Sequence, residues 1–381
     1  MSQARKPYKI CILNSNYPPS RGGIATFSGK LAEYLANSAR VRRVTVVAFN
    51  NPRPRQEQSG KLEIFAYPKT SLLAMASKIF RQILKHRDSD VFHATTIFPV
   101  GAFVWLFAGF FLRKKVFITV HGTDVLTREG SAKTRWVKRK IMSAATKVLA
   151  NSLSTAELAA KANGVALKKF EVIYPGVDQK VFVSRPENVR AKYHLSNKDF
   201  VVLSVCRLVR RKGVDDIIAA IAKIPQADVK LLIVGAGEEE GRLRDQVSQL
   251  GLTERVKFTG RVSDEEVVNC YASADLFVAA SKFLLEAGDI EGLGISLLEA
   301  QYFGLPVIGT LSGGIPEAVK PNETGFLVGE GDCGAIAEKI MELKNNPALR
   351  RRMGENARKF VRQNFSWEGS ARKHLEIYSH G

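Results

Sequence analysis

Two glutamates frame a glycine-rich turn in the segment Glu291-Gly-Leu-Gly-Ile-Ser-Leu-Leu-Glu299. Glycines let the backbone approach a ligand closely, and the free N–H groups at a helix start attract phosphate. We expect a helix to begin near Ile295 and Ser296, with Glu291 on the loop before it and Glu299 about one turn inside it. A ligand with a central diphosphate and hydroxyl groups at both ends would suit this arrangement. The spacing alone is not specific, because two glutamates at this separation occur by chance in most chains of this length.

A cationic loop follows the first strand expected in the second half of the chain, in the segment Cys206-Arg207-Leu-Val-Arg-Arg-Lys212-Gly213. Arginine offers a rigid fork for diphosphate oxygens, and lysine offers a point charge. Arg207 and Lys212 could therefore hold one diphosphate from two sides. Arg210 and Arg211 between them could equally be solvated charges.

Two motifs in the first half could also meet a ligand. His121-Gly-Thr-Asp124 follows the strand expected at 116–120, and ligands of open α/β sheets bind outside the carboxyl ends of strands. A neutral histidine can donate one hydrogen bond and accept another, although a lone histidine is more often structural. Arg21-Gly22-Gly23 precedes a helix, so its N–H groups could reach a phosphate, or the glycines could simply allow a tight turn.

Other motifs do not support a cofactor or a metal. The segment Val234-Gly-Ala-Gly237 resembles a dinucleotide turn, but Gly241 falls one position late and three acidic residues crowd the helix start, so we exclude NAD binding there. Asp88-Ser-Asp90 fits a helix end and a loop better than a metal site. The four cysteines have neither metal-ligand nor disulfide-scaffold spacing, which indicates a reducing cytosol; they are Cys11, Cys206, Cys270 and Cys333.

The elements that would position these residues alternate between strand and helix, which predicts an α/β fold. We expect two Rossmann-like domains in tandem, residues 1–185 and 186–365, because a polar linker at 181–199 separates two series of apolar runs. A last helix at about 366–381 could pack back on the first domain through Trp367, Leu375 and Tyr378. The expected strands are 8–14, 44–49, 62–67, 91–96, 116–121, 148–151 and 170–174 in the first domain and 200–205, 229–234, 256–259, 276–280, 306–309 and 325–328 in the second.

Charge is distributed very unevenly along the chain. The net charge of the chain is +20. Residues 1–190 contain 32 basic and 11 acidic residues, whereas the remainder contains 25 basic and 26 acidic residues, so the whole excess lies in the first half. This asymmetry predicts a polyanionic partner for the first half, either an anionic membrane surface or a nucleic acid, unless the surface is simply basic and solvated. The stretch 72–87 has a basic amphipathic pattern, and 132–142 adds five Lys or Arg residues and a tryptophan, so we favour the membrane.

Neither residues 97–112 nor residues 1–9 predict a membrane span. The 16 uncharged residues at 97–112 fall short of the ~20 that a spanning helix needs, so we expect a buried crossover helix there. Residues 1–9 are polar and basic, without a signal peptide. We therefore expect a cytoplasmic protein that associates peripherally with the inner face of the cell membrane.

Taken together, these motifs resemble the retaining GT-B glycosyltransferases of family 4, over almost the whole chain. The motifs that carry the resemblance are Glu291-x7-Glu299 with its glycines, Arg207 to Gly213, Gly22-Gly23, His121-Gly-x-Asp124, Pro175-Gly-Val-Asp178 and Gly304-Leu-Pro306 with Gly313-Gly-Ile-Pro-Glu317. The resemblance implies a cleft between the two domains, with the acceptor on the first and the nucleotide-sugar on the second. One departure is Tyr174-Pro175-Gly176, where many members have Pro-Asn-Gly, and this leaves open what supports the cleft there.

The resemblance also implies roles for individual residues. Arg207 and Lys212 would hold the donor diphosphate, Glu299 would accept from the ribose, Glu291 would contact the sugar hydroxyls, and His121 would face the transferred sugar. The resemblance thus gives catalytic roles to His121, Arg207, Lys212 and Glu291, and donor-binding roles to Gly22, Gly23, Asp124, Arg261, Val262, Gly292, Leu293, Gly294, Ile295 and Glu299. It implies no metal and no cofactor, because the nucleotide-sugar is itself a substrate.

The implied reaction is transfer of a hexose, with retained anomeric configuration, from a nucleotide-diphospho-sugar to a lipid-linked or cell-envelope glycan. The acidic stretch Glu286-Ala-Gly-Asp289-Ile-Glu291 favours GDP-mannose as the donor over a UDP-sugar. Two alternatives stay open at this point. One is a nucleotide-sugar epimerase or phosphorylase on the same fold. The other is a basic nucleic-acid-binding protein, although the chain shows no recognised binding motif for nucleic acid.

Overall fold

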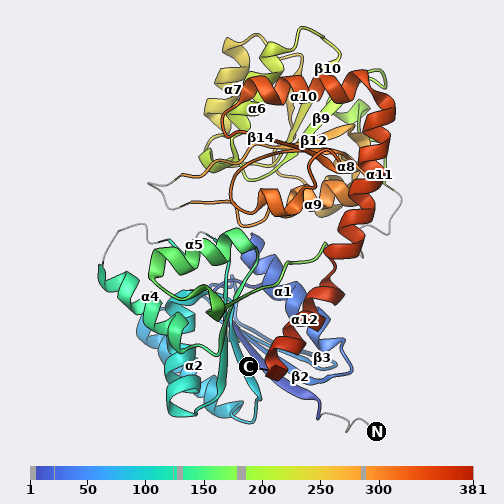
Figure 1. Ribbon diagram of the computed structural model, residues 1–381. Coiled ribbons are helices and arrows are strands. Elements are labelled where there is room, and N and C mark those ends of the chain that lie inside the picture. The colour runs from blue at the N-terminus through green and yellow to red at the C-terminus, as the bar shows by residue number, and fades with distance from the viewer. Residues whose placement is uncertain are drawn as a thin grey trace. The chain divides into compact units, whose positions relative to one another are not determined.

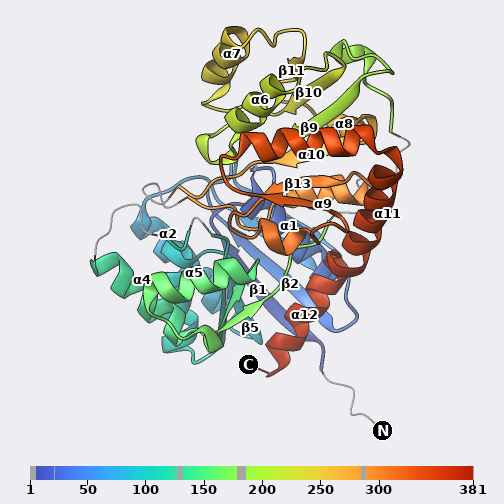
Figure 2. The same ribbon diagram turned by 45° about the horizontal axis from the view of Figure 1, so that its top comes forward.

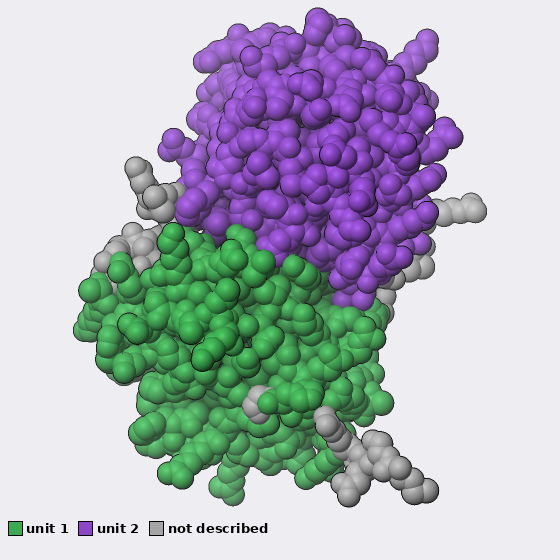
Figure 3. Space-filling model, in the orientation of Figure 1, with its two compact units in different colours: residues 1–176, 367–381 green, residues 177–366 purple. Residues whose placement is uncertain are grey.

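The chain folds as two compact units, each built around one mainly or wholly parallel sheet (Figure 1). The computed structural model describes residues 6–20, 22–122, 124–126, 132–177, 186–284 and 289–380. Unit 1 contains residues 1–176 and 367–381, and unit 2 contains residues 177–366; the two are coloured separately in Figure 3. Of the residues named above, Arg21, Thr123, Asp178 and Glu286 lie outside the described residues.

Unit 1 has an eight-stranded sheet in the order β3-β4-β2-β1-β5-β6-β7-β8, parallel except for the β3–β4 pair. The central strand β1 pairs with β2 and β5, so that Ile10 lies beside both Val44 and Val91. The sequence did not predict β3, because its residues RQEQS are polar; it is an exposed edge strand and needs no apolar face. The strands are β1 (Tyr8–Asn14), β2 (Val41–Ala48), β3 (Arg55–Ser59), β4 (Leu62–Ala66), β5 (Val91–Ala94), β6 (Lys115–Val120), β7 (Lys147–Ala150) and β8 (Phe170–Val172).

Helices cover both faces of this sheet. On one face, Ile10 and Ile12 of β1 pack in a cluster with α1 (Gly23–Ala36) and α12 (Trp367–His380). On the other face, Cys11 and Leu13 pack with α2 (Leu72–Lys85), α4 (Ala132–Ala144) and α5 (Leu153–Asn163). Burial on both faces explains why β1 is a continuous apolar run rather than an alternating one. Figures 1 and 2 both show α2 and α4 on the side of unit 1 opposite α12.

The connection from β5 to β6 differs from the expected buried helix. It consists of η1 (Ile97–Gly101), α3 (Ala102–Val104) and η2 (Trp105–Phe111); η2 is π-helical, whereas η1 is interrupted at Phe98, whose backbone is extended. Val100, Val104 and Ala108 are buried, but Phe98, Phe110 and Phe111 are exposed. The prediction of a crossover helix is therefore right, and the prediction that it is buried is wrong for its outer side. Among the described residues, no helix is both long enough and apolar enough to cross a membrane.

The last helix, α12, belongs to the core of unit 1. Trp367, Leu375 and Tyr378 are buried in the cluster that contains Ile10 and Ile12. A polar chain reaches deeper still, because the Tyr378 hydroxyl lies 2.7 Å from His93 Nδ1 and His93 Nε2 lies 2.7 Å from Thr119 Oγ1. The helix is thus fixed to β5 and β6 by hydrogen bonds as well as by packing.

Unit 2 has a six-stranded parallel sheet in the order β11-β10-β9-β12-β13-β14. Its core includes Val202 and Leu231 of the central strands, and Ile217 and Ile340 of the covering helices. The strands are β9 (Phe200–Val205), β10 (Val229–Val234), β11 (Val256–Phe258), β12 (Leu276–Ala279), β13 (Val307–Thr310) and β14 (Gly325–Val328), and the α-helices are α6 (Val214–Lys223), α7 (Glu240–Gln249), α8 (Asp264–Ser273), α9 (Ile295–Tyr302), α10 (Cys333–Asn345) and α11 (Pro347–Asn364).

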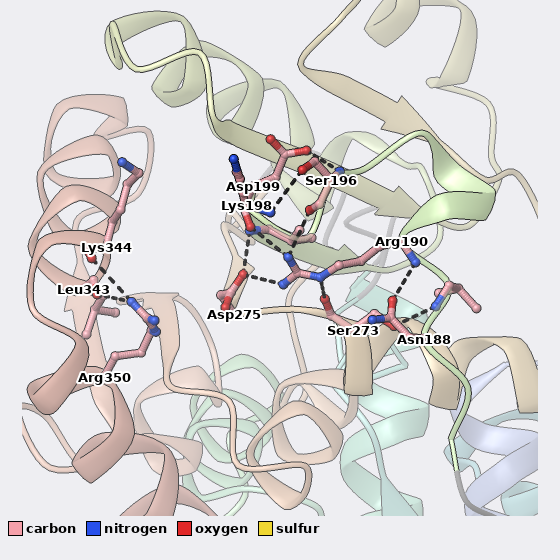
Figure 4. Close-up of polar contacts among 12 residues, drawn as sticks. Asn188, Arg190, Ser196, Lys198, Asp199, Ser273, Asp275, Leu343, Lys344 and Arg350 are labelled. Carbon is pink, nitrogen blue, oxygen red and sulfur yellow. Dashed lines mark hydrogen bonds and ion pairs between the residues drawn. The ribbon is translucent and has the colours of Figure 1, made fainter.

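Arg190 ties the segment that enters unit 2 to the start of its sheet (Figure 4). Its guanidinium donates to Ser273 O and Asp199 O at 2.9 Å each and pairs with Asp275 Oδ2 at 2.8 Å. A polar hollow of about 650 Å³ lies here, and its Lys344 pairs with Asp228 at 3.0 Å. Because these charges satisfy one another, the hollow is a structural junction rather than a candidate for catalysis.

Candidate functional site

Glu291 is the centre of a charged cluster in unit 2. Its Oε2 accepts hydrogen bonds from Lys212 Nζ, from Arg211 Nη1 at 2.7 Å and from Ser281 Oγ at 3.2 Å. The side chain is only 12% exposed. The structure thus brings together two of the predicted site residues, Lys212 and Glu291, and adds Arg211 and Ser281 to them.

The charge state of Glu291 follows from these contacts. Burial would by itself raise the pKa of this carboxyl, but the cations of Lys212 and Arg211 outweigh burial and lower the pKa to about 2. Glu291 is therefore a carboxylate throughout the neutral range. A group with this pKa cannot hold a proton near pH 7, so it is suited to binding and electrostatic stabilisation rather than to general acid catalysis.

Arg211 is the residue of this cluster that the sequence left unassigned. Besides Glu291, it pairs through Nε with Asp289 Oδ1 at 2.9 Å, and its side chain is 11% exposed. The two carboxylates on one guanidinium fix the loop that precedes α9. Arg210, its neighbour, is exposed, so only one of the two undecided arginines is solvated.

Arg207 lies on the same loop, but the structure does not bring it to Glu291. Its side chain is exposed and has no hydrogen bond or ion pair to the described residues. The loop backbone itself is fixed, because Leu208 N donates to Ala236 O at 3.1 Å and Glu239 N donates to Leu208 O at 3.1 Å. Arg207 is thus a cation held out from an anchored backbone.

Glycines set the position of this loop. A Cβ atom at Gly237 would lie 2.1 Å from Leu208 O, and one at Gly235 would lie 1.9 Å from Cys206 O. In the segment that resembles a dinucleotide turn, the glycines therefore allow its backbone to contact the backbone of the cationic loop. Gly213 closes the loop with φ +61°, a conformation that favours glycine, and a Cβ there would lie 1.9 Å from Ala280 O.

The start of α9 is built in the same way. Gly294 precedes the helix with φ +84°, and Gly314 N donates to Glu291 O at 3.0 Å. A Cβ at Gly313 would lie 2.1 Å from Glu291 O, and one at Gly314 would lie 2.1 Å from Gly292 O. The second glycine-rich motif thus supports the first, and the first N–H groups of α9 stay outside the helix's own hydrogen bonding.

Glu299 lies on α9, one turn beyond its start. Its Oε2 accepts a hydrogen bond from the Tyr271 hydroxyl at 2.9 Å, and the same hydroxyl lies 3.1 Å from Ser296 O. Burial raises the pKa of Tyr271 well above its ordinary value, so the phenol remains a donor. In unit 2, the other predicted donor-binding residues lie at the start of α9 and on two loops. Ile295 is the first residue of α9, Gly292 and Leu293 with Gly294 precede it, and Arg261, which is exposed, follows β11 with the half-buried Val262.

In unit 1, the structure brings His121 and Asp124 together. His121 N donates to Asp124 Oδ1 at 2.8 Å, and His121 Nε2 lies 3.1 Å from Thr95 O. Because a carbonyl oxygen only accepts, Nε2 carries the proton and Nδ1 is left as an acceptor. Burial lowers the pKa of His121, so the ring is neutral at pH 7.

Gly22 and Gly23 lie at the start of α1, and both are exposed. Gly22 has φ +122°, and a Cβ at either glycine would meet no heavy atom within 4 Å. The helix has no side-chain cap and no acidic residue in its first turn. Its N–H groups are therefore open to an anion, as far as the described residues show.

The described residues contain no group of three or more His, Cys, Asp or Glu side chains that could hold a metal ion. Asp88 pairs with Lys9 at 2.6 Å and with Arg43 at 2.7 Å, so the Asp-Ser-Asp triplet has structural partners. All four cysteines are free.

Known families and proteins match this chain along its length. Residues 21–181 match the family described as Glycosyltransferase Family 4, and residues 186–360 match the one described as Glycosyl transferases group 1. The GDP-mannose-dependent monoacylated alpha-(1-6)-phosphatidylinositol monomannoside mannosyltransferase of Corynebacterium glutamicum is 31% identical, over 97% of this chain and 96% of that protein. The N-acetyl-alpha-D-glucosaminyl L-malate synthase of Bacillus anthracis is 30% identical, over 83% and 80%.

The fold is also similar to solved structures. The sucrose-phosphate synthase from Thermosynechococcus elongatus superimposes with a TM-score of 0.77 at 26% identity, over 98% of this chain and 98% of that one. The two tandem parallel sheets are those of a GT-B fold, as the sequence predicted.

Proposed function

Because this chain belongs to the family 4 glycosyltransferases, we propose that it transfers mannose from GDP-mannose to a lipid-linked or cell-envelope acceptor. Membership in this family makes it a hexosyltransferase of the retaining class, which sets aside the interpretation as a nucleic-acid-binding protein. The donor, the acceptor and the residues that bind them are the proposal.

The Glu291 cluster at the start of α9 carries the proposal for the donor. Lys212 and the N–H groups of α9 would stabilise the negative charge that grows on the departing diphosphate. When Lys212 turns to the diphosphate, Arg211 keeps a cation on Glu291, and Glu291 remains ionised beside the sugar hydroxyls. Arg207, exposed on its anchored backbone, would close on the diphosphate from the other side.

Two further contacts would orient the donor. Glu299, held by the Tyr271 hydroxyl, has a carboxylate that can accept from the ribose. The neutral ring of His121 can accept a hydrogen bond from a sugar hydroxyl at Nδ1. The acceptor hydroxyl would then attack on the face from which the diphosphate leaves, and the leaving phosphate would take its proton.

Support for GDP-mannose comes mainly from the relatives. Proteins that are 29–31% identical over nearly the whole chain are GDP-mannose-dependent. The acidic stretch before Glu291 gives less support than the sequence suggested, because Asp289 is committed to Arg211 and Glu286 lies outside the described residues. A UDP-sugar is therefore the alternative that the assay must include.

Support for a lipid-linked acceptor comes from the same relatives, whose names specify a phosphatidylinositol monomannoside, and from the net charge of +21 in residues 1–190. We place the protein on the inner face of the cell membrane as a peripheral enzyme of cell-envelope glycan synthesis. An anionic membrane surface would then be a partner of unit 1.

A thermal-shift panel of GDP, UDP, ADP and their sugars tests the donor. We expect GDP and GDP-mannose to raise Tm more than the others do; a larger shift with UDP compounds would overturn the choice of base.

A coupled assay tests the class of reaction. It should show release of the nucleoside diphosphate only when an acceptor is present. Acceptor-independent conversion of the sugar would instead indicate an epimerase, and dependence on inorganic phosphate would indicate a phosphorylase.

Substitution of the two cations tests the diphosphate clamp. We expect Arg207→Ala and Lys212→Ala each to lower kcat/KM by ~10²-fold or more, as for the loss of an oxyanion donor. Arg210→Ala is the matched control, because Arg210 is an exposed cation on the same loop. Near-normal turnover in both clamp variants, or an equal loss in the control, would contradict the clamp.

A further inference from the structure

The crossover between β5 and β6 is apolar on its outer side as well as on its inner side. Val104 and Ala108 point into the core, whereas Phe110 and Phe111 are 63% and 64% exposed. No charged residue occurs in 97–112. A helical segment that is apolar all round is normally covered on every side, and within unit 1 the sheet covers only one side of this segment.

The helices that contact this crossover extend its apolar surface. Both α2 and α4 contact η2, and the ring of Phe80 on α2 lies 5.2 Å from that of Phe107. Leu73 on α2 is 84% exposed, and Trp136 on α4 is 61% exposed. We call this surface the aromatic face; it consists of the outer sides of α2, of residues 97–115 and of α4.

Every charge on the aromatic face is positive. No acidic residue occurs in α2, in residues 97–115 or in α4. Cations are present in each part, and those with exposed or half-exposed side chains have no ion pair with a described carboxylate; they are Lys78, Arg81, Lys85, Arg113, Lys114, Lys115, Lys133, Arg135, Arg139 and Lys140. In contrast, Lys9, Arg43 and Lys147 elsewhere in unit 1 are paired with Asp or Glu.

A hollow on this face combines the two kinds of side chain. Its volume is about 570 Å³, and it lies beside the start of β6. Trp105, Phe110 and Phe111 form apolar walls, while Arg113 and Lys114 supply cations. A cation next to an aromatic wall suits a molecule with a phosphate joined to a hydrocarbon chain. On α4, Trp136 has Lys140 Nζ 5.6 Å from its ring centroid, and an aromatic ring beside a cation is typical of a membrane interface.

We propose that the aromatic face docks on a bilayer of anionic phospholipids, with Phe110 and Phe111 inserted at the acyl boundary and a lipid phosphate held by Arg113 and Lys114. Charge alone would suit a nucleic acid, but the aromatic face also exposes aliphatic side chains such as Leu73, which offer no ring on which a base could stack. An apolar surface alone would suit a protein, but a set of cations without a single acid specifies an anionic partner. This docking rests on the proposed function, because it would bring the enzyme to an acceptor that lies in the membrane.

Vesicle sedimentation of the full-length protein tests this docking. We expect binding to phosphatidylglycerol vesicles and weak binding to phosphatidylcholine vesicles. Part of the binding to phosphatidylglycerol should persist at high salt, because salt screens charge interactions but not the insertion of apolar side chains. The double variant Phe110→Ser/Phe111→Ser should bind at least tenfold more weakly. The matched control is Leu167→Ser/Leu250→Ser, because these leucines are exposed to 47% and 44% in other parts of the chain.

Tryptophan fluorescence adds a direct readout of insertion. On vesicle binding, the emission should shift to the blue and be quenched by brominated lipid tails, and Trp136→Phe should reduce both effects. Insertion would be overturned if high salt abolished vesicle binding completely and the phenylalanine variant bound as well as the wild type. A concentration-dependent dimer that the phenylalanine variant dissociates would overturn the choice of partner.

The outcome can be separated from that of the proposed function. The phenylalanine variant should keep the wild-type thermal shift with nucleotide, because its substitutions are in unit 1 and the Glu291 cluster is in unit 2. If the wild-type protein does not bind vesicles but shows a normal thermal shift with nucleotide, the docking alone is refuted. Vesicle binding without any nucleotide shift would refute the donor proposal alone.

Discussion

At the scale of single residues, two side chains that the sequence left unassigned decide the geometry of the candidate site. Arg211 pairs with both Asp289 and Glu291, so it fixes the carboxylate nearest to the proposed sugar. Tyr271 donates to Glu299 and thereby orients the carboxylate proposed to bind the ribose. Both residues act through another side chain, which is why a motif search for ligand contacts does not select them.

Tyr271→Phe tests the second of these arrangements. The ring keeps its stacking on Phe303, but Glu299 loses a hydrogen bond. We expect KM for the donor to rise by roughly 5–10-fold with little change in kcat, as for the loss of about one hydrogen bond that is made equally in ground and transition states. Tyr193→Phe is a suitable control, because its hydroxyl binds Glu266 at 2.6 Å rather than a predicted site residue. An unchanged donor KM would show that Glu299 is not positioned by Tyr271.

At the scale of elements, the site depends on loops that are held by backbone contacts. The start of α9 rests on Gly313 and Gly314, and the cationic loop rests on Gly235 and Gly237. Side-chain ion pairs then set the final orientation. Loss of a single backbone contact should therefore affect activity as well as stability.

Gly314→Ala tests this support. The new Cβ would lie 2.1 Å from Gly292 O, so the loop before α9 must shift. We expect Tm to fall by several degrees, as for a destabilisation of roughly 1–3 kcal/mol, and kcat/KM to fall at least tenfold. Gly241→Ala is the control: a Cβ there meets no heavy atom within 4 Å inside helix α7, so it should leave activity unchanged and add about 0.5–1 kcal/mol of stability. Equal effects of the two substitutions would contradict the argument.

At the scale of the whole molecule, the end of the chain completes the core of unit 1. The buried histidines His93 and His374 lie where α12 meets the sheet, with ring centroids 5.8 Å apart. Burial lowers the pKa of His374 to about 4 and that of His93 well below its ordinary value. Both rings are therefore neutral in the folded protein at pH values where an unfolded histidine takes up a proton.

This difference predicts acid sensitivity in a defined pH range. Because the folded pKa is lower than the unfolded value of about 6.5, the stabilisation is complete above pH 6.5 and is lost as pH falls toward 4. His374 alone accounts for ~3 kcal/mol at most over this range. Calorimetry should show Tm falling between pH 7 and pH 5, before Glu291 and Asp88, whose pKa values are about 2, begin to contribute.

The variant His374→Gln identifies the source of this loss. Glutamine does not titrate, so we expect its Tm to fall less steeply over the same range. His93, His121 and His86, whose pKa values are also lowered by burial, account for the remainder. An identical slope in the variant and the wild type would assign the acid sensitivity to other groups.

The sequence by itself determined the class of fold, the family and most of the strands. Apolar runs such as Tyr8–Asn14 need burial on both faces, and only a sheet covered by helices provides it. The glycines at 213, 294, 313 and 314 could be located from their motifs, because only glycine tolerates the left-handed backbone or the close contacts that those turns require. The polar strand β3 escaped prediction, because an exposed edge carries no apolar signal.

Tertiary structure decided which charges meet and which apolar side chains stay outside. Arg210 and Arg211 are neighbours of the same type, yet only Arg211 reaches the carboxylates of a loop about 80 residues away. In the same way, Val104 and Phe110 belong to one uncharged run, and only the packing of the crossover on its sheet buries the first and exposes the second. Long-range contacts of this kind depend on the path of the backbone through space, and the local pattern of residue types does not encode that path.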